Sequence, residues 1–168
     1  MNSDLLIVID VQKGFVNRWT AHLLARVEAL QAEYGRVVAT RFVNPPGSLY
    51  RRLMGWHGFA PGSDDVELAF AQLPNARVMD KTTYTCVSDD FAAELRRDGV
   101  RRVEVCGVAT DNCVLKSAVD LFERGIEPVV LADFCASHGG PEYHAAGLLL
   151  ARRFLGPSQV SSASPLRR

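Results

Sequence analysis

Three side chains that could act together in covalent catalysis stand at the ends of strand-like runs. Asp10 closes LLIVID, Lys81 closes RVMDK, and Cys113 lies where a strand-like run meets a helix-like run in GVATDNCVLKSAVDLFERG. In a parallel α/β sheet, ligands bind beyond the carboxyl ends of the strands, so residues at several such ends converge in space. We therefore expect the acid, the lysine and the cysteine to share one site.

These three residue types fit acyl transfer through a thioester. A cysteine attacks a carbonyl carbon as the thiolate, so its pKa of about 8.5 must fall, and a nearby ammonium group or a helix N-terminus can lower it. Lys81 and the helix that opens near Cys113 could supply both effects. A carboxylate such as Asp10 could deliver a proton to the leaving group and later take one from water.

Three ordered stretches, LLIVIDVQKGF, DKTTYTCV and GVATDNCV, resemble the cysteine hydrolases of the isochorismatase-like superfamily, which includes nicotinamidases and N-carbamoyl amidases. The resemblance runs from about residue 4 to residue 164. It implies that Asp10, Lys81 and Cys113 are a catalytic triad. It also implies a cis peptide between Val108 and Ala109, and an oxyanion hole formed by the backbone amides of Ala109 and Cys113.

Aromatic residues near the strand ends are candidates for the walls of a substrate pocket. The resemblance places a ring against the substrate at Phe15, and Trp19, Trp56 and Tyr84 could complete the enclosure. Aromatic side chains are more often part of a core than ligand contacts, so core packing is the alternative for each of them.

Metal binding is where the sequence departs from part of the resembled family. Nicotinamidases carry an Asp-x-His pattern just after the second strand, but TRFVNPP has Phe42 and Asn44 at the matching positions. Phenylalanine cannot ligate, and an asparagine oxygen is a poor substitute for imidazole. His57 would be an isolated remnant of such a site. We therefore predict no metal and no other cofactor, and we rank nicotinamidase activity low.

Other polar residues near these stretches have competing interpretations. His138 and His144 match no standard ligand spacing, so we favour local hydrogen bonding for both. Arg41 and the pair at positions 51 and 52 could bind a substrate carboxylate through bidentate contacts. A solvated surface role is equally consistent with these arginines.

Composition limits the class of partner. The chain has 168 residues, 48% of them hydrophobic, which suits one domain spanning residues 1–168. Nineteen basic and nineteen acidic residues cancel, which argues against nucleic acid or an anionic membrane as principal partner and favours a small-molecule substrate. No basic leader or apolar run of about 18 residues is present, and four unpaired cysteines suit a reducing compartment, so we expect a cytoplasmic protein. The resemblance implies a homodimer or homotetramer.

Strand-length apolar runs alternate with helix-period segments, which predicts an α/β fold. We expect three αβα layers around a doubly wound, mostly parallel six-stranded sheet of order 3-2-1-4-5-6. The segment 44–63, rich in proline and glycine, is predicted to be irregular and to cover the substrate. Residues 165–168 are expected to be frayed. The predicted strands are 5–10, 37–43, 77–80, 102–107, 127–132 and 158–162, and the predicted helices are 20–33, 64–72, 88–98, 111–124 and 140–154.

The leading hypothesis is a metal-independent cysteine hydrolase that cleaves a small amide, ureido or related C–N bond. One alternative is an isochorismatase that hydrolyses a vinyl ether, although the resembled members with that activity lack the cysteine. A nicotinamidase and a non-catalytic binding or scaffold protein are further alternatives. A dinucleotide-binding enzyme is disfavoured because no GxGxxG pattern follows the first strand.

Overall fold

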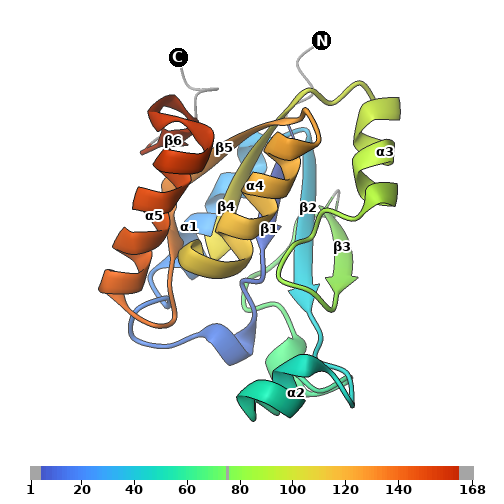
Figure 1. The fold of residues 1–168 in the computed structure, drawn as a ribbon, viewed down its shortest axis with the longest axis vertical. Coiled ribbons are helices and arrows are strands. Elements are labelled where there is room, and N and C mark those ends of the chain that lie inside the picture. The colour runs from blue at the N-terminus through green and yellow to red at the C-terminus, as the bar shows by residue number, and fades with distance from the viewer. Residues whose placement is uncertain (1–4, 75, 163–168) are drawn as a thin grey trace.

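A computed structural model describes residues 5–74 and 76–162. Its centre is one six-stranded sheet of order β3-β2-β1-β4-β5-β6, as predicted, and every neighbouring pair is parallel (Figure 1). The sheet had been expected to be only mostly parallel. The strands are β1 (Leu5–Ile9), β2 (Arg36–Phe42), β3 (Ala76–Lys81), β4 (Arg102–Val108), β5 (Glu127–Ala136) and β6 (Val160–Ser161).

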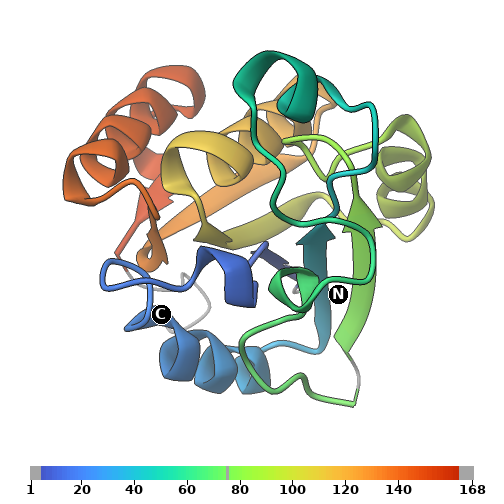
Figure 2. The same ribbon diagram turned by 90° about the horizontal axis from the view of Figure 1, so that it is seen from below.

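Helices cover both faces of this sheet, because its central strands are apolar on both sides. All five residues of β1 are buried, as the strand of a doubly covered parallel sheet must be. One helix, α1, lies on one face, whereas α4 and α5 lie on the other (Figure 2). Within the described residues, no helix is long and apolar enough to span a membrane. The helices are α1 (Leu23–Leu30), α2 (Leu49–Met54), α3 (Asp89–Arg97), α4 (Leu115–Glu123) and α5 (Pro141–Leu155).

The prediction of a helix over residues 64–72 is wrong. Only a 3-10 turn, Asp64–Val66, forms there, and the chain then runs extended, with Leu68 bridged to Gln12. The buried Gln12 side chain donates to the carbonyl oxygens of Phe42 and Val66, at 3.0 and 2.7 Å, which holds this segment across the end of the sheet. The alternation of apolar residues at 66, 68 and 70 is the strand-like signal that the helix prediction overlooked.

Two other predicted segments differ in part from the structure. The predicted strand 158–162 shrinks to Val160–Ser161, because a 3-10 turn occupies Pro157–Gln159. The segment 44–63 contains a helix, α2, whose first turn is capped by the Ser48 side chain. It lies beyond the carboxyl ends of β2 and β3 in Figure 1, where it can cover a site at that edge. Residues 165–168 lie outside the described residues.

The strand order reverses between β1 and β4, which is where α/β sheets bind ligands. The two strands approach closely at Gly107, whose φ is +119°. A Cβ atom there would lie 2.1 Å from the carbonyl oxygen of Ile9, so only glycine fits. The path of β4 toward the switch point therefore depends on this residue.

A second close approach fixes the turn that follows β4. Helix α5 packs against the π-helical turn η4 (Thr110–Val114) through Gly147, which is buried. A Cβ atom on Gly147 would lie 2.7 Å from both the Asp111 nitrogen and the Thr110 carbonyl carbon. The missing side chain therefore lets α5 press directly on the backbone of the turn.

We expect Gly147→Ala to lower the free energy of unfolding by roughly 1–3 kcal/mol, the usual cost of overpacking. The sign of this change in the free energy of unfolding is informative. Alanine is the better helix former and, without the steric clash, would stabilise α5 by about 1 kcal/mol. Urea unfolding followed by circular dichroism measures the change. Gly35→Ala is the control, since a Cβ atom there meets nothing within 4 Å. A Gly147→Ala protein as stable as the parent would contradict the packing argument.

Candidate active site

Asp10 immediately follows β1 and is fully buried. Its backbone has φ of +47°, a left-handed conformation that non-glycine residues adopt at a cost and that often marks functional sites. Thr40 of β2 holds it from both sides: the Thr40 Oγ1 atom accepts from the Asp10 amide at 3.2 Å and donates to Oδ1 at 2.7 Å. The second carboxylate oxygen, Oδ2, is thereby directed toward Lys81.

Lys81 ends β3, and its side chain is 5% exposed. Its ammonium nitrogen lies 2.6 Å from Asp10 Oδ2 and donates to the carbonyl oxygens of Thr83 and Tyr84 at 2.9 and 3.1 Å. The same nitrogen lies 3.6 Å from Cys113 Sγ. Burial opposes the ammonium charge, but the neighbouring groups, with Asp10 foremost, outweigh it and raise the pKa of Lys81. Lys81 is therefore a fixed cation between the acid and the thiol.

Cys113 lies in the π-helical turn η4, directly ahead of α4 (Leu115–Glu123). Such turns are rare and occur frequently at functional sites. The residue is 6% exposed, and it lines a cavity of about 260 Å³ at the carboxyl edge of the sheet. The three predicted triad residues, from three separate strand ends, are thus gathered at one place.

The expected fall in the pKa of Cys113 is not what this environment produces. Burial raises the pKa of the thiol well above its usual value, and the Asp10 carboxylate raises it further, whereas Lys81 lowers it. The lysine charge is largely compensated by its ion pair with Asp10. Its lowering effect on the pKa of Cys113 is therefore smaller than the raising effects of burial and Asp10. The resting site therefore contains a neutral thiol beside an ion pair.

Three of the four predicted aromatic residues line the cavity: Phe15, Trp56 and Tyr84. Trp19 does not. It is 37% exposed and lies beside Gly140 in a separate depression, with the Arg18 guanidinium 4.2 Å from its ring centre. The 3-10 turn that starts the segment after β1 turns Phe15 inward, and the chain beyond it leads Trp19 outward.

Sequence reasoning missed four further residues of the cavity wall. Phe42 lies parallel to Trp56 with ring centres 5.4 Å apart, so a residue considered only as a lost metal ligand is a wall of the pocket. Its position at the end of β2 was the available signal. The other three are Met54, Asn112 and His138, and Ala109, already expected at the site, also lines the cavity.

The peptide bond between Val108 and Ala109 is cis, as the resemblance implied. Ala109 lies between β4 and the π-helical turn, and its carbonyl oxygen accepts from the amides of Asn112 and Val114 at 3.0 and 3.1 Å. Ala109 and Cys113 both line the cavity, as the predicted oxyanion hole requires. The assignment of their amides as oxyanion donors stays a prediction.

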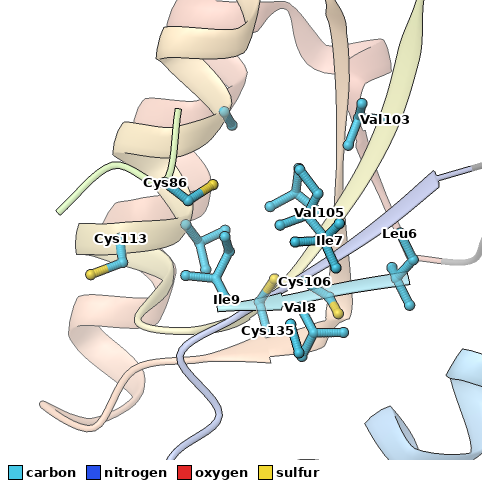
Figure 3. Packing of buried hydrophobic residues seen from close by; sticks show 14 of the residues in the cluster. Leu6, Ile7, Val8, Ile9, Cys86, Val103, Val105, Cys106, Cys113 and Cys135 are labelled. Atoms are coloured by element: carbon cyan, nitrogen blue, oxygen red, sulfur yellow. The ribbon is translucent and has the colours of Figure 1, made fainter. Parts of the chain in front are cut away.

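The other three cysteines do not line the cavity. In the close-up view, Cys106 and Cys135 lie among strand residues such as Val8, away from Cys113 (Figure 3). All three are buried, and burial raises the pKa of Cys86 to about 11 and that of Cys135 to about 12. They are core residues.

Two of the three arginines considered for a substrate carboxylate, Arg41 and Arg51, are engaged elsewhere. Arg41 pairs with Asp80 at 2.7 Å and with Glu67 at 3.4 Å. Arg51 donates to the carbonyl oxygen of Asn44 at 2.9 Å, inside the loop that carries α2. Neither residue lines the cavity.

The chain belongs to the isochorismatase family, because residues 4–161 match the Isochorismatase domain. An isochorismatase family protein PncA of Bacillus subtilis (strain 168) is 37% identical over 76 residues, which cover 45% of this chain and 41% of that protein. The matched segment therefore spans less than half the length of this relative.

Solved structures of the same fold extend over nearly the whole chain. Nicotinamidase PncA from Bacillus subtilis has a TM-score of 0.80 at 22% identity, covering 95% of this chain and 99% of its own. A pyrazinamidase of Pyrococcus horikoshii in complex with zinc has a TM-score of 0.79 at 23% identity, covering 95% and 97%. At these identities the likeness establishes the fold alone.

The residues at the corresponding place in this chain do not fit a metal ion. Phe42 offers only a ring. The Asn44 amide donates to the carbonyl oxygens of Trp56 and Gly58, at 2.9 and 3.0 Å, and its oxygen accepts from Ser48 at 2.5 Å. His57 is exposed. Within residues 5–74 and 76–162, no three histidine, cysteine or acidic side chains are grouped so that they could hold a metal.

We expect Asp10→Asn to accelerate alkylation of Cys113 by iodoacetamide at pH 7.5 and Lys81→Met to slow it. The first change removes the charge that raises the thiol pKa, and the second removes the charge that lowers it. A shift of one pKa unit changes the thiolate fraction about tenfold. Peptide mass spectrometry follows the rate, with Cys135 as the internal control. Equal rates in both variants would refute the electrostatic assignment.

Removing divalent metals should leave the protein unchanged, because Asn44 is committed to the loop that carries α2. The unfolding temperature measured with excess EDTA should match that measured with Zn²⁺ to within about 1 °C, and elemental analysis should find less than about 0.1 equivalent of metal after dialysis. Asn44→Ala is the matched variant: it should lower the unfolding temperature by several degrees, since it removes buried hydrogen bonds. Stoichiometric zinc after dialysis would contradict this expectation.

Proposed function

We propose that this protein is a metal-independent cysteine hydrolase that cleaves a small amide, ureido or related C–N bond through a thioester on Cys113. The observation that carries the proposal is the buried cluster in which Lys81 Nζ lies 2.6 Å from Asp10 Oδ2 and 3.6 Å from Cys113 Sγ, at the wall of a cavity. Membership in the isochorismatase family supports it, and so does the likeness to solved nicotinamidase and pyrazinamidase structures.

In the proposed acylation, the thiol proton passes to Asp10 as Cys113 Sγ attacks the substrate carbonyl carbon. The neutralised acid frees the Lys81 charge, which then stabilises the sulfur anion when it is needed. The tetrahedral oxyanion accepts hydrogen bonds from the backbone amides of Ala109 and Cys113. Collapse breaks the C–N bond, and Asp10 returns its proton to the departing nitrogen.

In the proposed deacylation, water enters the space that the amine leaves. Asp10, again a carboxylate, takes one proton from this water, and the water oxygen attacks the thioester carbonyl carbon. The second tetrahedral intermediate uses the same backbone amides. Its collapse breaks the C–S bond, the acid product departs, and the proton on Asp10 returns to the sulfur. The cycle consumes one water and restores the neutral thiol.

The alternative functions differ in whether they need Cys113. Vinyl ether hydrolysis by the resembled isochorismatases proceeds without the cysteine, so the thiol would be dispensable. Nicotinamide hydrolysis would have to run here without a metal, because Phe42 and Asn44 do not supply ligands. A scaffold protein would need none of the three charged or reactive groups. Dependence on the sulfur therefore distinguishes these activities.

We expect Cys113→Ala and Cys113→Ser to reduce turnover at least about 10³-fold while the protein remains folded, because the nucleophile is lost. The measurement is release of ammonia or amine from a panel of small carboxamides, nicotinamide and ureido compounds, together with mass-spectrometric trapping of acylated Cys113. Cys86→Ala is the matched control, since it removes a buried thiol that does not line the cavity.

Two outcomes would overturn the proposal. Cys113→Ala turning over a substrate at the parental rate would exclude the covalent route and favour an isochorismatase-type reaction. No turnover of any panel member by the parent, together with no adduct on Cys113, would favour a binding role for the cavity.

A further inference from the structure

We propose that His138 binds the substrate: its Nε2 atom accepts a hydrogen bond from an uncharged donor group away from the scissile carbonyl, and Asp111 is the positioning residue that holds the opposite ring nitrogen protonated. This inference rests on the proposed function for the identity of the pocket. It adds a substrate-binding contact on a part of the cavity wall that Asp10, Lys81 and Cys113 do not form.

The His138 ring is held in place. It follows β5 (Glu127–Ala136) and lines the same cavity as Cys113. Its ring centre lies 4.9 Å from that of Phe15, and its carbonyl oxygen accepts from the Asn17 side chain at 2.9 Å. A ring packed in this way presents a fixed edge to the cavity, which is what a specificity contact requires.

The two ring nitrogens have different surroundings. Nδ1 is buried and, among the described residues, has no hydrogen-bond partner, whereas Nε2 is not buried. A carboxylate oxygen, Asp111 Oδ1, is also buried without a partner, and the Asp111 charge acts on His138. The two atoms are not hydrogen-bonded to each other, but the Asp111 charge favours the tautomer with the proton on Nδ1. Nε2 is then an acceptor at the cavity wall.

The imidazole is an uncharged acceptor at neutral pH. Burial lowers the pKa of His138, and the opposing effect of Asp111 does not overcome it. The ring therefore offers a lone pair rather than a second cation. A neutral donor such as a hydroxyl or an amide N–H fits it.

The rest of the cavity also argues for an uncharged ligand. Of the described residues that line it, none is arginine or lysine, and most of the wall is aromatic or aliphatic. Lys81 is nearby, but its charge is taken up by Asp10 and two backbone carbonyls. A substrate carboxylate would lose its hydration with no cation to meet it. The substrate class is therefore a flat neutral amide with a hydrogen-bond donor, in preference to an anionic ureido acid.

Binding to the Cys113→Ser protein tests this inference without turnover. The probes, measured by calorimetry, are 3- and 4-hydroxybenzamide, the matching 3- and 4-methylbenzamides, and 3-carboxybenzamide. We expect one hydroxyl compound to bind about five- to tenfold more tightly than its methyl counterpart, the usual range for one neutral hydrogen bond, and the carboxylate to bind most weakly.

Additional substitutions, each made in the Cys113→Ser protein, identify the residue responsible for the preference for hydroxyl over methyl. In the Cys113→Ser background, His138→Leu should abolish the preference for hydroxyl over methyl, and His138→Gln, which keeps an acceptor, should retain part of it. Asp111→Ala should reduce the preference. His144→Gln should leave it unchanged, because that imidazole bonds to Thr110 at 2.7 Å and does not line the cavity.

The inference is overturned by a hydroxyl preference that survives His138→Leu, by tightest binding of the carboxylate, or by no binding of any probe at millimolar concentration. Hydrolysis by the parent enzyme is assayed separately. Loss of turnover in Cys113→Ala with no effect of His138 on binding would leave the proposed function standing and remove only the role of His138.

Discussion

The buried ion pair between Asp10 and Lys81 is the interaction on which the rest of the site depends. Removing one partner of such a pair typically costs about 3–5 kcal/mol, yet replacing both by apolar residues is often neutral, so stability alone does not explain its presence. Further hydrogen bonds hold both members of the pair in place. Thr40 donates to the Asp10 carboxylate, and the carbonyl oxygens of Thr83 and Tyr84 accept from the Lys81 ammonium. Together these contacts place a charge within reach of a thiol that the site itself keeps neutral.

Two missing side chains let the fold bring the thiol to that pair. Gly107 allows β4 to pass against β1, and Gly147 allows α5 to press on the turn that carries Cys113. Overpacking at either place would displace backbone rather than a flexible side chain, because the atoms that a Cβ would meet are backbone atoms. The position of the sulfur is therefore set by packing on both sides of the turn, and the aromatic residues of the cavity surround the space in front of it.

The sequence was sufficient for the architecture and for the convergence of Asp10, Lys81 and Cys113 at one place, because both follow from local patterns. Apolar runs bounded by turns predicted the strands, and their ends carry Asp10, Lys81 and Cys113. Where local pattern competes with distant contacts, prediction failed. The segment 64–72 was assigned to a helix, but backbone hydrogen bonds to Val11 and Lys13 pair it with the distant chain after β1, and the Gln12 side chain anchors its 3-10 turn. Phe42 and Trp19 were misjudged because the direction of a ring at a strand end or turn depends on neighbours far along the chain.

What the sequence by itself determined is which reactive groups exist and that strand ends would gather them, because a parallel sheet places every carboxyl end at one edge. The tertiary structure alone decided their state. Burial and the Asp10 charge raise the pKa of Cys113, although a lysine beside a cysteine suggests the opposite. Desolvation and charge compensation depend on three-dimensional distances that no linear spacing encodes. The same is true of His138, whose two ring nitrogens acquire different roles only through the residues packed around them.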